Sequence, residues 1–318
     1  MDQFIGELYR ARQSVESRRF KPWALESLKR QIPFDAALWG TGNVETRQFH
    51  SITITGLPED YAHALEQTQD HNPILPALLK NLGKAITMSS VFPDSRFYKS
   101  DLYRNCFQQY GVERILSVIE SDNRSGIYTL LSLYRFDRKQ DFSKEELRIQ
   151  ERCAFHLVNA ASHAFFLHLQ SSEDKDERGS TAICDPQGIF YEVQPLFLDL
   201  LEKHYPERSG NRLPFDTPAP GETRSYRGLR VSCKEFGDLY KIRIFEPSPL
   251  DKLTDKEMRI AQFISQGMTF KEIGRRINLA PSTVSNHMYR VYRKLGIASR
   301  SALADLMHAS NGSDLGDS

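Results

Sequence analysis

The last quarter of the chain holds a run of hydrogen-bonding side chains whose spacing places them on one side of a helix. At about 100° per residue, one face of the segment 281–295 collects hydroxyl, amide and guanidinium groups and no carboxylate. These residues are Ser282, Ser285, Asn286, Tyr289, Arg290 and Arg293. Such groups hydrogen-bond to phosphate oxygens and to base edges, so this face predicts recognition of double-stranded DNA.

The other side of the same segment carries the apolar residues that would hold the helix against a core. They fall within about 60° of one another and are Val284, Met288, Val291 and Leu295. Pro281 suits the first position of a helix, and Gly296 suits the position after its end. The sequence therefore predicts one amphipathic helix with a polar, basic outer face.

Two shorter helices are predicted before this segment from their capping residues. Thr254 is followed three residues later by Glu257, and Thr269 is followed at the same spacing by Glu272. In such a capping box each of the two residues hydrogen-bonds, through its side chain, to the backbone N–H of the other. Only residues 278–280 then separate the second helix from the polar one. Two helices joined by a tight turn can place the second in the major groove of DNA.

This region resembles the LuxR/GerE-type helix-turn-helix domain from Leu250 to about His308. The matching positions are Leu253-Thr-x-x-Glu257, Gly267, Lys271-Glu-Ile-Gly-Arg-Arg-Ile277, Ser282-Thr-Val284, Asn286-His287 and Arg293-Lys-Leu-Gly296. The resemblance implies that residues 270–289 form the helix-turn-helix unit. It also implies a fourth helix, with Ser299 as its cap, that contributes a dimer contact. We therefore expect a sequence-specific transcription regulator that binds promoter or operator DNA as a homodimer. RNA polymerase is its expected protein partner.

The residues that we expect at the DNA lie on the helix-turn-helix unit and on the continuation of its second helix. They are Phe270, Lys271, Ser282, Thr283, Ser285, Asn286, His287, Tyr289, Arg290, Arg293 and Lys294. Arg290 and Arg293 are assigned to phosphates, and the polar residues nearer the start of the helix to base edges. Two positions depart from the family. Ala280 stands where a capping Ser or Thr is usual, which weakens the helix start by ~0.5–2 kcal/mol. The position of Ser285 is often Lys or Glu in relatives, so the operator sequence that relatives bind cannot be assigned to this chain.

Charge is distributed unevenly along the chain. Residues 251–310 hold ten Lys or Arg and five Asp or Glu, a net charge of +5. Since the whole chain carries +1, the remainder carries −4. This asymmetry is typical of a basic nucleic-acid module joined to a neutral or acidic sensor.

The domain organisation follows from composition. The polar stretch 171–180 predicts a linker between a first domain, 1–170, and a middle module, 181–247. The DNA-binding domain is placed at 248–310 and a disordered tail at 311–318. The fold class predicted is α+β overall, with an α/β sensor domain, an α+β middle module and an all-α four-helix domain.

The first domain is predicted to contain two hairpins and a long closing helix. Strands are expected at 36–39 and 49–55, separated by a turn at 40–43, and at 115–120 and 126–134. The closing helix runs from about Ser143 towards His168. This order of elements resembles a GAF domain, a small sheet flanked by helices that often encloses a small molecule.

The middle module has short strands in 182–190, an apolar helix at 195–203 and alternating runs at 228–233 and 239–245. It resembles a PAS domain, but about 65 residues is short for one. We therefore interpret it as a PAS-like packing module rather than a sensing one.

A small-molecule effector is the natural signal for such a regulator, and three residues are candidates to bind it. Tyr61 and Asp70 have the Tyr-x8-Asp spacing of acyl-homoserine-lactone receptors, and Trp39 could supply an aromatic wall. Against lactone sensing, Leu57 replaces the expected Trp, and Asp70 is not followed by Pro. The alternatives are another small ligand, a domain controlled by a protein or without ligand, and an antiactivator that carries a DNA-binding domain. Ordinary packing or capping is the competing role for each of the three residues.

The sequence gives no sign of an enzyme, and no catalytic residue is assigned. It lacks a nucleophile elbow, an HExxH motif and a Gly-rich nucleotide loop, so no cofactor is expected. Cys106, Cys153, Cys184 and Cys233 are scattered without metal-ligand spacing, which predicts buried free thiols and no metal. No apolar run reaches the ~20 residues that cross a bilayer, and residues 1–30 lack a signal-peptide core. We expect a cytoplasmic protein without a membrane partner.

Overall fold

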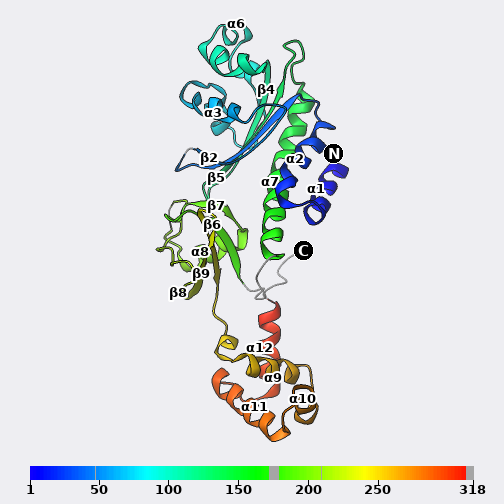
Figure 1. Cartoon of the computed structure of the whole chain (residues 1–318), viewed down its shortest axis with the longest axis vertical. Helices are drawn as coiled ribbons and strands as arrows, with labels where there is room; N and C mark the ends of the chain where they lie inside the picture. Colours follow the sequence, from blue (N-terminus) through cyan, green and yellow to red (C-terminus); the bar gives the residue numbers. More distant parts are fainter. Residues whose placement is uncertain (47, 172–178, 209, 313–318) are drawn as a thin grey trace. The chain divides into compact units, whose positions relative to one another are not determined.

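The computed structural model describes residues 1–46, 48–171, 179–208 and 210–312, and it divides the chain into two compact units (Figure 1). The first unit consists of Met1–Arg224 and Val231–Ile244. The second consists of Ser225–Arg230 and the chain from Phe245 onward. Most of the predicted linker, and residues 313–318 of the predicted tail, lie outside the described residues.

The first domain is built on a five-stranded antiparallel sheet in the order β2-β1-β5-β4-β3. Its strands are β1 (Ala36–Asn43), β2 (Gln48–Thr55), β3 (Ile86–Thr87), β4 (Arg114–Asp122) and β5 (Ile127–Arg135). Each neighbouring pair in this order is antiparallel. Both predicted hairpins are present, and the long central strands β1 and β5 pair along their whole length.

The turn predicted at 40–43 is wrong, because these residues continue strand β1. The two glycines leave room for groups of the neighbouring strands to lie against the backbone of β1. A Cβ at Gly40 would lie 2.6 Å from the ring of Phe49, and one at Gly42 would lie 2.4 Å from the carbonyl oxygen of Gln48. Gly40 and Gly42 therefore serve close approach between strands, and the chain reverses only after Asn43.

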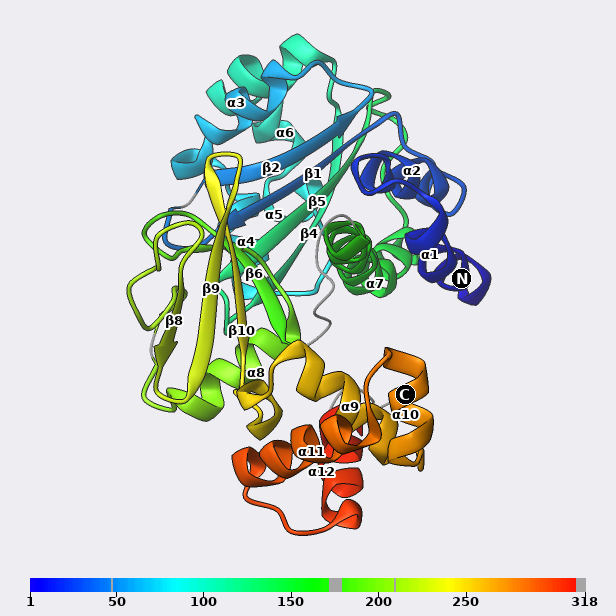
Figure 2. The same ribbon diagram turned by 60° about the horizontal axis from the view of Figure 1, so that its bottom comes forward.

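Helices cover both faces of this sheet (Figures 1 and 2). One face is covered by α1 (Asp2–Ser14), α2 (Ser17–Lys29) and α7 (Lys144–Ser171). The other face is covered by α3 (Asp60–Glu66), η1 (Gln69–His71), α4 (Ile74–Lys80), α5 (Met88–Val91), α6 (Asp94–Phe97), η2 (Tyr103–Phe107) and η3 (Gln108–Tyr110). The start of α7 is as predicted. Ser143 and Glu146 form a capping box, with the Ser143 N–H donating to Glu146 at 2.8 Å.

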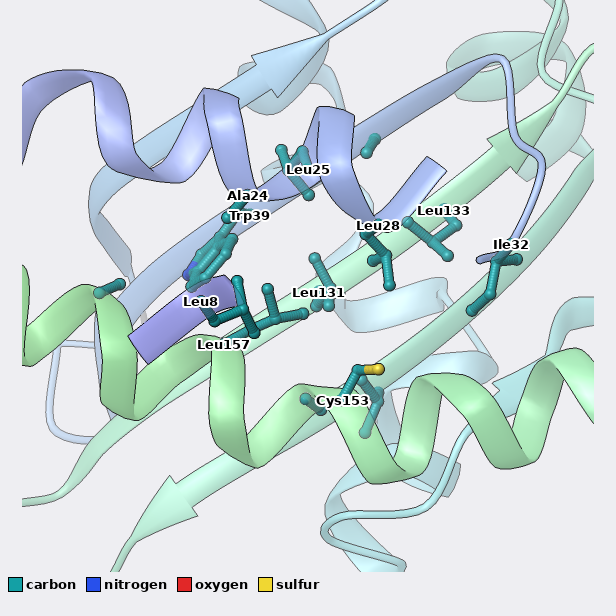
Figure 3. Close-up of a cluster of buried hydrophobic side chains, with 14 of the residues drawn as sticks. Leu8, Ala24, Leu25, Leu28, Ile32, Trp39, Leu131, Leu133, Cys153 and Leu157 are labelled. Atoms are coloured by element: carbon teal, nitrogen blue, oxygen red, sulfur yellow. The ribbon is translucent and has the colours of Figure 1, made fainter. Parts of the chain in front are cut away.

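Side chains alternate between the two faces along each strand and so build two separate cores. Trp39, Leu131 and Leu133 pack under α1, α2 and α7 (Figure 3). Leu38 and Tyr134 point the other way, into the layer of short helices. The sheet with a helical layer on each face agrees with the predicted GAF-like order of elements.

The middle module contains a second five-stranded antiparallel sheet, in the order β7-β6-β10-β9-β8. Its elements are β6 (Ser180–Cys184), β7 (Phe190–Val193), α8 (Pro195–His204), β8 (Thr223–Tyr226), β9 (Leu229–Phe236) and β10 (Leu239–Phe245). Counted from its own first strand, this sheet has the same strand order as the first sheet. Sequence analysis missed strand β8, which is short and mostly exposed.

Polar contacts join the first domain and the middle module within the first unit. The Asn43 side chain donates to the carbonyl oxygen of Phe190 at 3.1 Å. Arg124 forms ion pairs with Asp199 at 2.5 Å and with Glu202 at 2.7 Å. These contacts hold α8 and β7 to one end of the first sheet.

The second unit contains the four helices that the sequence predicted. Its elements are η4 (Pro249–Lys252), α9 (Asp255–Ser265), α10 (Phe270–Ile277), α11 (Pro281–Leu295) and α12 (Arg300–Gly312). Residues of all four helices, including Ile260, Ile273, Val284 and Leu303, form its core. In the described part of the chain, no helix has the length and apolar character needed to cross a bilayer.

Candidate nucleic-acid interface and apolar cavity

Helix α9 is fixed at its start by the predicted capping box, which also connects it to α11. The Thr254 N–H donates to Glu257 at 2.8 Å, and the Glu257 N–H donates to the Thr254 hydroxyl at 3.3 Å. Glu257 is buried and accepts a further hydrogen bond of 2.6 Å from Lys294 on α11. Burial raises the pKa of Glu257, but the hydrogen bonds from Lys294 and Thr254 outweigh it and lower this pKa to about 2.

Helices α10 and α11 are joined by a turn of three residues whose geometry depends on Gly274 and Asn278. A Cβ at Gly274 would lie 2.5 Å from the carbonyl oxygen of Leu279, so a larger residue would push the turn away. Asn278 has φ 54°, in the left-handed region that Asn tolerates better than most residues. Helix α11 then begins at Pro281 without a side-chain hydrogen bond from Ala280, as its sequence predicted.

The two faces of α11 are separated as the sequence predicted. Val284, Met288 and Val291 are buried in the domain core. The exposed residues are Ser282, Ser285, Asn286, Tyr289, Arg290 and Arg293, and the side chain of Tyr289 is 69% exposed. Since α11 contains no acidic residue, its outer face offers only donors, neutral acceptors and positive charge to a ligand.

The first domain contains an apolar cavity of about 480 Å³ between the sheet and the layer of short helices. Its lining is mainly Leu, Ile, Val and aromatic side chains from β4, β5, α4 and η2. Its polar lining residues include Glu66, Asp70, Asn72 and the pair Ser117–Ser132, whose hydroxyls are 2.7 Å apart. Burial raises the pKa of Tyr128 in this wall to about 12, so its phenol stays protonated at neutral pH. Such a lining suits a small molecule with an apolar part and a few polar groups.

The three predicted ligand residues are not brought together. Asp70 lines the cavity. Tyr61 is fully buried and is not among the residues that line the cavity. Its ring packs edge-on against the lining residue Tyr134, with ring centroids 5.3 Å apart. Trp39 lies on the opposite face of the sheet, in the core with α1, α2 and α7 (Figure 3). Trp39 lies on strand β1, where side chains alternate between the two faces of the sheet. Its residue type alone could not show which face it occupies.

All four cysteines are buried as free thiols, as predicted. Burial raises the pKa of Cys106, Cys153 and Cys233 to about 11 and raises that of Cys184 further. Within the described ranges, His, Cys, Asp and Glu side chains form no group that could hold a metal ion.

Comparison with known families identifies the helical part of the second unit. Residues 251–307 match the family described as bacterial regulatory proteins, luxR family. They form a LuxR-family helix-turn-helix domain. The matched range contains α9, α10 and α11 and most of α12, the four helices that the sequence predicted.

Curated relatives are similar to part of this chain. The response regulator UvrY of Escherichia coli (strain K12) is 32% identical over 76 residues, which are 23% of this chain and 35% of the relative. A nitrate/nitrite response regulator protein homolog of Haemophilus influenzae is 36% identical over 88 residues, 28% of this chain and 42% of the relative. The chain thus spans less than half of the length of each of these two relatives.

Among solved structures, the chain is similar to SdiA of Escherichia coli. The TM-score is 0.40 and the sequence identity 13%, with 98% of this chain and 97% of that chain covered.

Within the LuxR-family domain, the predicted DNA-contact residues differ in exposure. Those on the outer face of α11 are exposed, as are Phe270 and Lys271 at the start of α10. Thr283 and His287 are half-buried at the edges of that face. Lys294 is half-buried as well, and its ammonium group is engaged by Glu257.

Arg300 is a positioning residue that sequence analysis did not single out. Its guanidinium donates to the carbonyl oxygen of Ile264 at 3.1 Å and also to that of Met268. These carbonyls end α9 and begin the connection to α10, where a cation satisfies acceptors that the helix leaves free. The sequence shows a basic residue at the start of α12. It does not show the carbonyl groups that this residue binds, because they lie more than 30 residues away along the chain.

Proposed function

We propose that the chain is a sequence-specific transcription regulator that reads duplex DNA with α11. The observation that carries this proposal is the exposed face of α11, which has hydroxyl, amide and guanidinium groups and no carboxylate. The face is held on a helix-turn-helix frame by buried apolar residues and by the turn at Gly274 and Asn278. Because a recognition helix enters the major groove with one face, these are the groups that would meet the bases.

The proposed contacts divide along α11. Ser282, Ser285, Asn286 and Tyr289 are assigned to base edges, since hydroxyl and amide groups pair with the donor and acceptor pattern of the major groove. Arg290 and Arg293 are assigned to phosphates, together with the exposed Lys271 on α10. Thr283, His287 and Phe270 would pack beside the DNA backbone. Lys294 contributes positive charge while it pairs with Glu257.

The proposed active species is a homodimer on an inverted repeat. One recognition helix reads too few base pairs for useful specificity, and two related by a two-fold axis read two half-sites. Helix α12 is the proposed dimer contact of the DNA-binding domain, and RNA polymerase is the proposed partner at a promoter.

The apolar cavity supports a small-molecule effector for the first domain. The proposed ligand has an apolar body that fills the space beside α4 and a polar group within reach of Asp70 and Asn72. Mass spectrometry of small molecules released from the purified full chain tests this assignment. A bound acyl-homoserine lactone would establish the lactone alternative, and a different amphipathic molecule would identify another effector. Absence of any stoichiometric molecule, with no thermal shift in metabolite extracts, would contradict the effector.

Footprinting of the full chain on genomic fragments tests the regulator itself. We expect protection of a short inverted repeat that resists competition by excess unrelated duplex. The dimer is checked by the mass of the protein–DNA complex. Protection that spreads evenly over all fragments, with and without cell extract, would contradict sequence-specific binding.

A further inference from the structure

A second cavity, of about 390 Å³, lies on the other face of the first sheet, where α2 and α7 meet the middle module. It shares no lining residue with the apolar cavity. Its walls come from the sheet (Trp39, Thr41), from α7 (Ser162) and from β7 (Glu192). All of these residues belong to the first unit.

This cavity differs from the first in its charge. Lys21 on α2 lines it, with its ammonium group 3.0 Å from the hydroxyl of Ser51 and 5.7 Å from the ring centroid of Trp39. On the side of the middle module, Glu192 accepts a 3.3 Å hydrogen bond from Ser162. A cation and a carboxylate thus face one space, each with a hydroxyl as hydrogen-bond partner.

Burial disfavours both charges. It lowers the pKa of Lys21 and raises that of Glu192, and the attraction between the two residues opposes these shifts without cancelling them. Glu120 on β4 is a second carboxylate in the lining, and burial raises its pKa too. A ligand that brings its own ammonium and carboxylate groups would stabilise the charged forms of all three side chains.

Other ionic groups at the cavity are already engaged. Arg124 pairs with Asp199 and Glu202, and Asp122 accepts two hydrogen bonds, from the Ser125 hydroxyl at 2.8 Å and from the Arg124 N–H at 3.0 Å. His163 lies 2.8 Å from the guanidinium group of Arg12. The ligand-directed charges are therefore one ammonium group and two carboxylates. A ligand that matches these charges has one carboxylate, for the ammonium group, and two cationic groups, for the two carboxylates.

We propose that this cavity is a second ligand site, which binds a free α-amino acid with a basic side chain. Its carboxylate would accept from Lys21, its α-ammonium group would donate to Glu192, and its side-chain cation would pair with Glu120. The alkyl part would lie against Trp39. Because Glu192 belongs to the middle module and Lys21 to the first domain, the ligand would bind across both.

Trp39 provides a direct reporter for this site, since the chain has only one other tryptophan, Trp23. A full-length Trp23→Phe protein would be titrated with L-lysine, L-arginine and L-ornithine while Trp39 emission is recorded. Cadaverine, which lacks the carboxylate, and Nα-acetyl-L-lysine, which lacks the α-ammonium group, are the matched probes. We expect saturable binding of at least one amino acid, with its carboxylate-free or α-acetylated analogue at least tenfold weaker.

Two variants assign the charges, and a third is the control. Lys21→Met should remove the preference for L-lysine over cadaverine, and Glu192→Gln should remove the preference over Nα-acetyl-L-lysine. Lys29→Met, at an exposed lysine of the same helix that does not line the cavity, should bind like the parent. Melting curves show whether each variant folds. If only one of the two charge variants folds, that variant alone tests the proposal.

The proposal is overturned if none of the three amino acids changes Trp39 emission or the melting temperature. It is also overturned if binding is undiminished in both charge variants. Neither readout involves DNA, so failure here would leave the proposed regulator function untouched.

Discussion

Lys294 on α11 and Glu257 on α9 form an ion pair of 2.6 Å, and Glu257 at the same time caps the helix on which it lies. A single buried carboxylate thus fixes the start of α9 and its position against the helix proposed to read DNA. The domain core and the capping boxes of α9 and α10 are also made within residues 249–307.

The first prediction is that the DNA-binding domain folds by itself. A fragment of residues 249–318 should be helical by circular dichroism and should melt cooperatively. It should bind the operator more weakly than the full chain, because the first domain, through α7, is expected to add dimer contacts. An unfolded fragment would contradict this modular account. Equal affinity of fragment and full chain would show that the first domain adds no dimerisation energy.

The second prediction concerns the pH dependence of the pair. Glu257→Gln should lower the free energy of unfolding of the fragment by about 1.5–3 kcal/mol at pH 7. Since the folded pKa of about 2 lies below the ordinary value of 4.5, the stabilisation is fully present above pH 4.5 and is lost as the pH falls towards 2. Urea unfolding of parent and variant at several pH values measures the difference. A difference that stays constant between pH 5 and pH 2.5 would contradict the assignment.

The third prediction uses the uncapped start of α11. Ala280 has the extended backbone of an N-cap residue, with φ −64° and ψ 143°, but makes no side-chain cap. Ala280→Ser should raise the free energy of unfolding of the fragment by ~0.5–2 kcal/mol, because serine can accept from the first free N–H groups. Ala280→Val is the control, since valine caps poorly. Equal stability of the serine and valine variants would show that another group already satisfies this helix end.

The fourth prediction separates phosphate contacts from base contacts. Arg293→Ala should weaken binding to all duplexes by a similar factor and reduce the slope of log affinity against log salt by about 0.9. Arg259→Ala is a matched control, because it removes another exposed arginine, on α9 and outside the helix-turn-helix unit. If Arg293→Ala leaves the slope unchanged and alters the preference at one base pair, Arg293 reads a base instead.

Much of the DNA-binding domain was predictable because its signals are local. Capping boxes such as Thr254–Glu257 span one helical turn, and the two faces of α11 follow from helical periodicity alone. The tight turn was visible as a short gap before Pro281. What escaped prediction depends on partners far along the chain, such as the hydrogen bonds from Arg300 to the end of α9.

The first unit was less predictable because strand faces and pairings are set by distant segments. Gly40 and Gly42 have the composition of a turn, and only the rings of Phe49 and Tyr128 explain why they lie within a strand. Trp39 was grouped with Asp70 by residue type, yet the sheet separates the two. The common strand order of the two sheets could not be predicted, since strand β8 has no apolar alternation.

The central claim is that the exposed face of α11 reads base sequence. Selection of bound duplexes from a random library, with the full chain and with Asn286→Ala, tests it most directly. We expect the parent to select an inverted repeat, and the variant to lose preference at one position in each half-site, by about 1–3 kcal/mol, while the other positions remain. If the parent selects no common sequence, or if Asn286→Ala, Ser285→Ala and Tyr289→Ala all select the same sequence as the parent, α11 does not read the bases.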